Sequence, residues 1–103
     1  MTSAVVHILL SLADTDRHGL GIAADVKTFT AGRVTLGPGT LYGTIKRLLD
    51  DELIEDLGAP LAEDHDPRRR YYRITARGRR ALEVEMQGLT SVLGVARRRL
   101  KTS

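Results

Sequence analysis

The sequence predicts a mostly helical α+β fold, and three observations support this prediction. Apolar residues recur at helical spacing in four separate segments. Two short segments with β propensity, 53–57 and 69–74, flank a polar loop ahead of the last helix. The length of 103 residues is that of one domain. The order helix, helix, turn, helix, hairpin, helix is that of a winged helix-turn-helix, with three helices and a two-stranded wing, followed by a long C-terminal dimerisation helix.

The first two helices are predicted from short apolar stripes. The stripe of the first helix consists of Val5, Ile8, Leu9 and Leu12. Thr2 or Ser3 is suited to cap the start of this helix. A second helix is expected over about 18–29, with a stripe made of Ile22, Val26 and Phe29. The pair Ala31-Gly32 then marks a turn before the third helix.

The third helix is expected from Pro38 to about Asp51, since proline is favoured at the first helical position. Its buried stripe consists of Leu41, Ile45 and Leu48, with Leu49 on the flank. Near the start of the helix, the opposite face lacks bulky side chains. Gly39 and Gly43 there let the backbone of the helix come close to a phosphate or a base edge. The residues expected to bind DNA from this helix are Thr40, Tyr42, Lys46 and Arg47. For Tyr42, packing on the edge of the core is an equal alternative.

The two strands are expected to form a hairpin, with residues 58–67 as its loop. From Arg68 to Arg80 there are seven arginines and no acid, while Asp50 to Asp66 carries eight acids and no lysine or arginine. This segregation suggests a cationic edge directed at one partner, with Arg68, Arg69 and Arg70 at the wing beside DNA. The alternative is a basic strand that is balanced by the acidic segment across the hairpin.

Thr75 is expected to cap a long final helix. Apolar residues then recur at spacings of 4 and 3 and form a heptad seam for dimerisation: Leu82, Met86, Leu89, Leu93, Ala96 and Leu100. Residues 1–75 would form the DNA-binding part and residues 76–103 the dimerisation helix of the same compact unit. Met86, Leu89 and Leu93 would pack in the dimer core, or would line a pocket for a small apolar effector.

Composition and motifs exclude several classes of function. The net charge of +3 gives a mild bias toward polyanions, and the absence of cysteine excludes disulfides and thiolate metal sites and fits a cytoplasmic location. We find no catalytic arrangement and no cofactor motif, so the protein is not expected to be an enzyme. His65 between two aspartates suggests a solvated loop rather than a metal site. The apolar run 4–13 is too short to span a membrane and lacks the flanks of a signal peptide.

Two motifs carry a specific resemblance. Residues 36–48 read LGPGTLYGTIKRL, and residues 70–82 read RYYRITARGRRAL, with the strand segment LIE at 53–55 between them. This pattern resembles the PadR family of bacterial transcriptional regulators over roughly residues 7–85, and the short final helix resembles the compact subgroup of that family. Glu52 stands where the family often has glycine, so the helix end either uses another cap or places a non-glycine residue at positive φ.

The resemblance implies a homodimer that binds an inverted-repeat operator, usually as a repressor, through the third helix and the wing. It also implies that the last helix and the first helix build the dimer. The leading hypothesis is therefore a sequence-specific DNA-binding regulator. The alternative is a winged helix that binds a partner protein through the surface of the third helix or through the seam.

Overall fold

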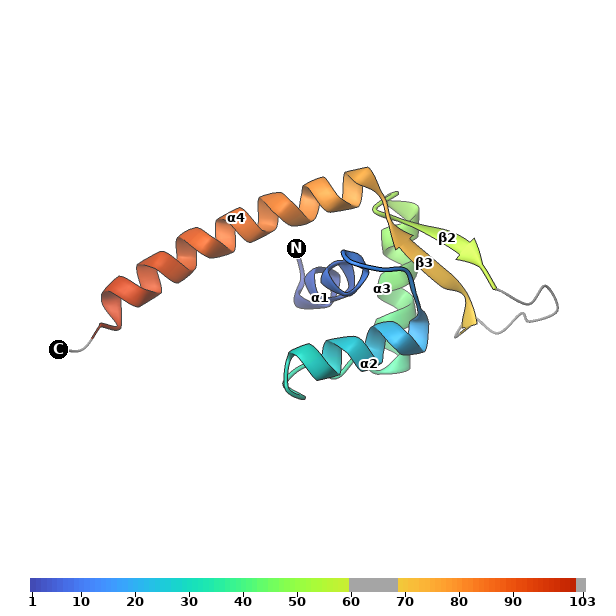
Figure 1. Ribbon diagram of the computed structural model, residues 1–103, viewed down its shortest axis with the longest axis horizontal. Coiled ribbons are helices and arrows are strands. Elements are labelled where there is room, and N and C mark those ends of the chain that lie inside the picture. Colours follow the sequence, from blue (N-terminus) through green and yellow to red (C-terminus); the bar gives the residue numbers. More distant parts are fainter. Residues whose placement is uncertain (60–68, 102–103) are drawn as a thin grey trace.

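The computed structural model describes residues 1–59 and 69–101. Its elements are α1 (Ser3–Leu12), β1 (Arg17–His18), α2 (Gly19–Phe29), α3 (Pro38–Asp50), β2 (Ile54–Gly58), β3 (Tyr71–Ile74) and α4 (Ala76–Arg99). Helices α1, α2 and α3 gather beside the small sheet, and α4 runs from the sheet past α1 to a distant C-terminus (Figure 1). The predicted mostly helical α+β fold is confirmed.

The core forms where the apolar stripes of the helices meet the inner side of the sheet. Its residues are Ile8, Leu9, Leu12, Ile22, Val26, Leu41, Ile45, Leu48, Ile54, Tyr72, Ile74 and Leu82. Helix α1 is central, because it contacts α2, α3, α4 and β3. In the predicted stripes of α1, α2 and α3, Val5 is half-buried and the other residues are buried except Phe29. Phe29 is 46% exposed, because it lies at the very end of α2 and stacks on the ring of His7 rather than entering the core.

The sheet contains a strand that the sequence did not predict. β1 has only two residues, which pair antiparallel with β3 at Tyr71 and Tyr72. The strand order is therefore β1-β3-β2, with the wing hairpin formed by β2 and β3 as expected. Such a short strand leaves no periodic pattern to read. It begins at Arg17 and leads directly into α2, so it fixes the start of that helix to the sheet.

Side chains cap the starts of α1 and α2, whereas α3 ends through an unusual backbone conformation. Thr2 accepts a hydrogen bond from the Val5 backbone at 3.3 Å and caps α1, as predicted. The start of α2 is capped by His18, whose Nδ1 accepts from the Gly21 amide at 2.9 Å. At the end of α3, Glu52 adopts a φ of 60°, so the chain leaves this helix through a non-glycine residue in the left-handed region.

The start of α4 lies against the start of β2. The Thr75 amide donates to the Leu53 carbonyl at 3.1 Å, and the Thr75 hydroxyl donates to the Glu52 carbonyl at 2.7 Å. The same hydroxyl accepts from the Gly78 amide at 3.0 Å, which is the predicted cap of α4. A Cβ atom at Gly78 would overlap the Leu53 carbonyl. Glycine at this position therefore allows two backbones to touch.

The remainder of α4 extends beyond the domain. Leu82 is only 5% exposed and Met86 packs against the core, whereas Leu89 and Leu93 are each 48% exposed and Leu100 is 76% exposed. The predicted seam is thus divided, and Leu82 belongs to the core of its own chain instead of lying free for a partner. Across 1–59 and 69–101, no helix has the length and apolar character needed to cross a membrane.

We predict that Gly78→Ala lowers the free energy of unfolding by about 1–3 kcal/mol, because the added methyl group must displace the Leu53 backbone. The matched control is Gly43→Ala in α3, where a Cβ meets nothing within 4 Å. This control should raise stability by up to about 1 kcal/mol, the ordinary gain of alanine over glycine in a helix. Urea unfolding of both variants measures the difference, and equal effects would contradict the proposed contact.

Candidate nucleic-acid interface

Helix α3 presents a bare and exposed outer face. Its inner stripe, Leu41, Ile45 and Leu48, is at most 2% exposed. On the outer side, a Cβ at Gly39 or at Gly43 would meet nothing within 4 Å. The first turn contains no acid, and no side chain caps its amides by a hydrogen bond. This end of α3 can therefore receive an anion close to the backbone.

Polar and basic side chains border this bare face. Thr40, Lys46 and Arg47 are all exposed. Arg47 lies on the flank toward α1, where it lines a shallow hollow together with Met1 and Thr2. Asp50 is exposed one turn beyond Lys46, so an acidic residue follows the two cations at the end of α3. The three side chains expected to bind DNA are accessible to it.

Tyr42 occupies a different position from these residues. Its ring lies against Gly19 at the start of α2, so closely that a Cβ at Gly19 would lie 2.7 Å from the Tyr42 hydroxyl oxygen. The hydroxyl oxygen is buried. The alternative of packing on the core edge therefore describes this conformation, and a DNA contact from Tyr42 would require the side chain to rotate. Binding of DNA by Tyr42 stays a prediction.

The wing is less cationic than the sequence suggested. The Nε atom of Arg70 donates to Oδ2 of Asp56 across the hairpin at 2.8 Å. Burial acts to raise the pKa of Asp56, but the hydrogen bonds from Arg70 and from the Gly58 amide lower it below its usual value. The balanced-hairpin alternative therefore describes the position of Arg70, and binding of DNA by Arg70 stays a prediction. Arg69 is exposed beside β3, and Arg68 lies outside the described residues.

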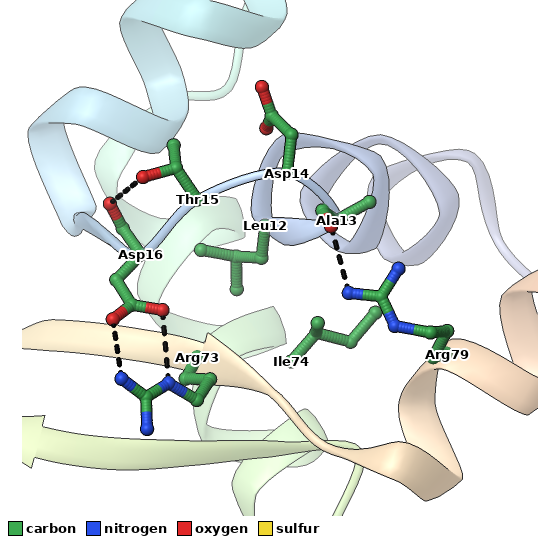
Figure 2. A pocket seen from close by; sticks show the side chains of 8 residues that line it. All are labelled: Leu12, Ala13, Asp14, Thr15, Asp16, Arg73, Ile74 and Arg79. Atoms are coloured by element: carbon green, nitrogen blue, oxygen red, sulfur yellow. Dashed lines mark hydrogen bonds and ion pairs between the residues drawn. The ribbon is translucent and has the colours of Figure 1, made fainter.

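Two further arginines of the basic segment brace the fold (Figure 2). Arg73 holds Asp16 through two hydrogen bonds, of 3.1 Å from Nε and 2.8 Å from Nη2. Arg79 donates from Nη2 to the Ala13 carbonyl at 2.8 Å, which closes the end of α1. Both border a hollow of about 190 Å³ between the α1–β1 connection, β3 and α4. Arg73 and Arg79 are exposed, but both hold other parts of the same chain, so the seven arginines do not all point to one outside partner.

The described residues hold no group of three histidine, cysteine, aspartate or glutamate side chains that could bind a metal ion. The loop with Asp64, His65 and Asp66 lies outside those residues.

The Arg73 hydrogen bonds lower the pKa of Asp16 below its ordinary value of 3.8. A carboxyl group with a lowered pKa in the folded state stabilises that state above its unfolded pKa, and this contribution is lost as pH falls through the folded pKa. We predict that Arg73→Gln lowers Tm at about pH 7, and that the difference from the unmutated protein shrinks at about pH 3.

The matched control is Arg77→Gln, which removes an exposed arginine from the same segment. It should change Tm little at either pH, because Arg77, unlike Arg73, forms no ion pair with a carboxylate of the described residues. Thermal unfolding followed by circular dichroism supplies both values. If Arg73→Gln lowers Tm by the same amount at both pH values, the ionised carboxylate of Asp16 does not stabilise the fold through its pair with Arg73.

Comparison with known proteins agrees with this architecture. The family model described as the Transcriptional regulator PadR-like family matches residues 8–84. An uncharacterised 37.1 kDa protein of transposon Tn4556 from Streptomyces fradiae is 33% identical over 87 residues, which are 84% of this chain and 23% of that protein. The chain thus spans about a quarter of the length of that relative.

Solved structures show the same fold. A PadR family transcription regulator from Clostridium difficile R20291 has a TM-score of 0.79 and 25% identity, covering 97% of this chain and 100% of the other. A PadR-like transcriptional regulator from Bacillus cereus has a TM-score of 0.77 and 22% identity, over 96% and 92% of the two chains. Bacillus subtilis PadR in complex with operator DNA has a TM-score of 0.72 and 19% identity, over 84% and 48%.

Proposed function

The chain belongs to the PadR-like family of transcriptional regulators, and on this premise we propose that it is a homodimeric repressor that binds an inverted-repeat operator. The family and the structural relatives are transcriptional regulators rather than enzymes. The observation that carries the proposal is the outer face of α3, which is bare at Gly39 and Gly43 and is bordered by exposed cations. The operator complex of Bacillus subtilis PadR supports the same use of this fold.

In the proposed complex, α3 enters the major groove with its first turns leading. The two glycines let the helix backbone approach the groove wall, and the free amides at the start of α3 face a phosphate. Thr40 would donate its hydroxyl near that phosphate. Lys46 and Arg47 would bind phosphates or guanine edges, which are the groups these side chains bind most often.

The wing would add fewer contacts than the third helix. Arg70 is engaged by Asp56 at 2.8 Å, so its guanidinium is partly neutralised before DNA arrives. Arg69 is exposed beside β3. We therefore assign sequence reading to α3, and contact with the flanking phosphates to the wing.

The homodimer is supported by the exposed apolar residues of α4 beyond the domain, which are Leu89, Val92, Leu93 and Leu100. A two-fold dimer places two copies of α3 on successive turns of the major groove, about 34 Å apart, and so requires an inverted repeat. Occupation of such a site would block transcription. In the proposed dimer, packing between subunits explains why the apolar side chains of Leu89 and Leu93 are exposed in a single copy. The proposal therefore includes no effector.

We predict that Lys46→Ala and Arg47→Ala each weaken binding to the operator by roughly 5- to 100-fold. Each change removes a cation from the exposed face of α3 without touching the core, so the thermal unfolding curve should be nearly unchanged. Fluorescence anisotropy with a duplex from the promoter of its own operon measures the affinity. The slope of affinity against salt concentration should fall by about one for each phosphate that the variant no longer neutralises.

The matched control is Arg98→Ala, which removes one exposed cation from the far end of α4. It should leave operator affinity within about twofold, because in the proposed complex the end of α4 does not touch DNA. Absence of salt-dependent binding by the unmutated dimer would favour the rival function, in which the winged helix binds a partner protein. An equal loss of affinity in all three variants would mean that only net charge matters.

A further inference from the structure

The stretch from the end of α2 to the end of α3 carries charge of one sign only. Residues 26–49 include four cations, Lys27, Arg33, Lys46 and Arg47, and no aspartate or glutamate. Lys27 lies in the last turn of α2, where the helix dipole favours a cation. Lys46 and Arg47 belong to the proposed DNA-binding face of α3. Neither explanation applies to Arg33, which lies in the connection between the two helices.

This connection, residues 33–37, has one side against the core and one exposed side. Val34 and Leu36 pack against the core, whereas Arg33 and Thr35 are exposed. Alternating burial is typical of an extended chain, whose successive side chains point to opposite sides. Arg33 and Thr35 therefore leave the connection on the same side. The exposed side continues into Gly37, the residue that precedes the first turn of α3.

Hydrogen bonds of Thr30 hold the start of the connection in place. The Thr30 hydroxyl donates to the Val26 carbonyl at 2.7 Å, and its oxygen accepts from the Val34 amide at 3.1 Å. The Arg33 amide donates to the Thr30 carbonyl at 3.1 Å. A side chain on a fixed backbone loses less conformational entropy on binding than one on a mobile loop. Arg33 is therefore offered to a partner from a defined position.

The fold uses neither of the two exposed side chains in the part of the chain that the structure describes. Arg33 forms no ion pair there, in contrast to Arg70 and Arg73. The Thr35 hydroxyl forms no hydrogen bond with any of the same residues. A guanidinium beside a hydroxyl matches a phosphate, which carries negative charge and accepts several hydrogen bonds.

We propose that Arg33 and Thr35 bind the phosphate backbone of operator DNA beside the part of the groove that α3 occupies. This inference rests on the proposed function and adds a backbone contact to it. The guanidinium of Arg33 binds one phosphate, and the Thr35 hydroxyl donates to the same phosphate or to the next one. At 3.3–3.6 Å per residue, Arg33 is at most about 14 Å from Gly37, so the contact stays close to the start of α3.

This contact and the wing lie on opposite sides of α3. Helix α2 starts at the sheet and runs away from it, so the connection that follows α2 lies far from the hairpin of β2 and β3 (Figure 1). Backbone contacts on both sides of a helix fix its register and orientation on the duplex without reading bases. Arg33 and Thr35 are therefore positioning residues, and recognition of bases stays with α3.

Arg33→Ala should weaken binding to a duplex from the promoter of its own operon by roughly 5- to 30-fold, because each copy in the dimer loses one phosphate contact. The slope of log affinity against log salt concentration should fall by about two across the dimer. Arg33→Lys keeps the charge and should retain affinity within about threefold. Fluorescence anisotropy supplies these values, and an unchanged Tm shows that the fold is intact.

Thr35→Val removes a hydroxyl and no charge. It should weaken binding by about 2- to 5-fold and leave the salt slope unchanged. The control Arg98→Ala should show neither the loss of affinity nor the change in slope, because residue 98 lies at the far end of α4.

The phosphate itself is located with duplexes in which one phosphate at a time is replaced by an uncharged methylphosphonate. For the unmutated protein, replacement of the phosphate that Arg33 binds should weaken binding. The same replacement should change binding by Arg33→Ala less than about twofold, because the partner of that phosphate is already absent. Equal losses for both proteins at every position would overturn the inference.

The outcomes separate this inference from the proposed function. If the unmutated protein shows no salt-dependent binding to DNA, the proposed function is wrong and this inference is wrong with it. If Arg33→Ala binds the operator with the affinity and salt slope of the unmutated protein, only the inference is wrong.

Discussion

The contact between the first turn of α4 and the start of β2 determines how the parts of this protein are arranged. Helix α3 ends through Glu52 at positive φ, and the Leu53 amide then returns to the Leu48 carbonyl at 2.9 Å. Thr75 bonds both Glu52 and Leu53, and the absence of a side chain at Gly78 lets the backbone of α4 close onto the strand. Helices α3 and α4 are therefore joined through hydrogen-bonded backbone and not through a linker.

A second set of contacts secures the other side of the domain. Arg73 and Arg79 join the connection between α1 and β1 to β3 and to α4, and β1 continues straight into α2. Tyr42 then packs α3 against the first residue of α2, Gly19. Through these contacts α1, α2 and α3 are each positioned against the sheet. Because α4 is attached to the same sheet, the orientation of α3 is fixed relative to α4.

The sequence predicted the elements whose side chains repeat, and missed those that depend on single long-range contacts. Stripes such as Leu41, Ile45 and Leu48 are periodic, and burial follows from periodicity. The strand β1 has only two residues, so it carries no period. The accessibility of Thr40, Lys46 and Arg47 followed from the same helical geometry. For Arg70 the sequence offered a balance across the hairpin as an alternative, without naming Asp56. The pairing of Arg73 with Asp16 was not predicted, because the two residues are 57 positions apart along the chain.

The proposed DNA-binding face of α3 carries few exposed cations. In the proposed dimer, α4 is therefore as important for affinity as the residues of α3. In the proposed complex, α3 of one copy brings Lys46 and Arg47 to the DNA, and each phosphate contact adds only a modest, salt-sensitive part of the affinity. Two copies joined at a fixed spacing make the second binding step intramolecular, which multiplies affinity without new contacts. This gain exists only if both helices face the same side of the duplex at once. In the proposed dimer, the close contact of α4 with Leu53 at Gly78 would help to hold the two copies of α3 at this spacing.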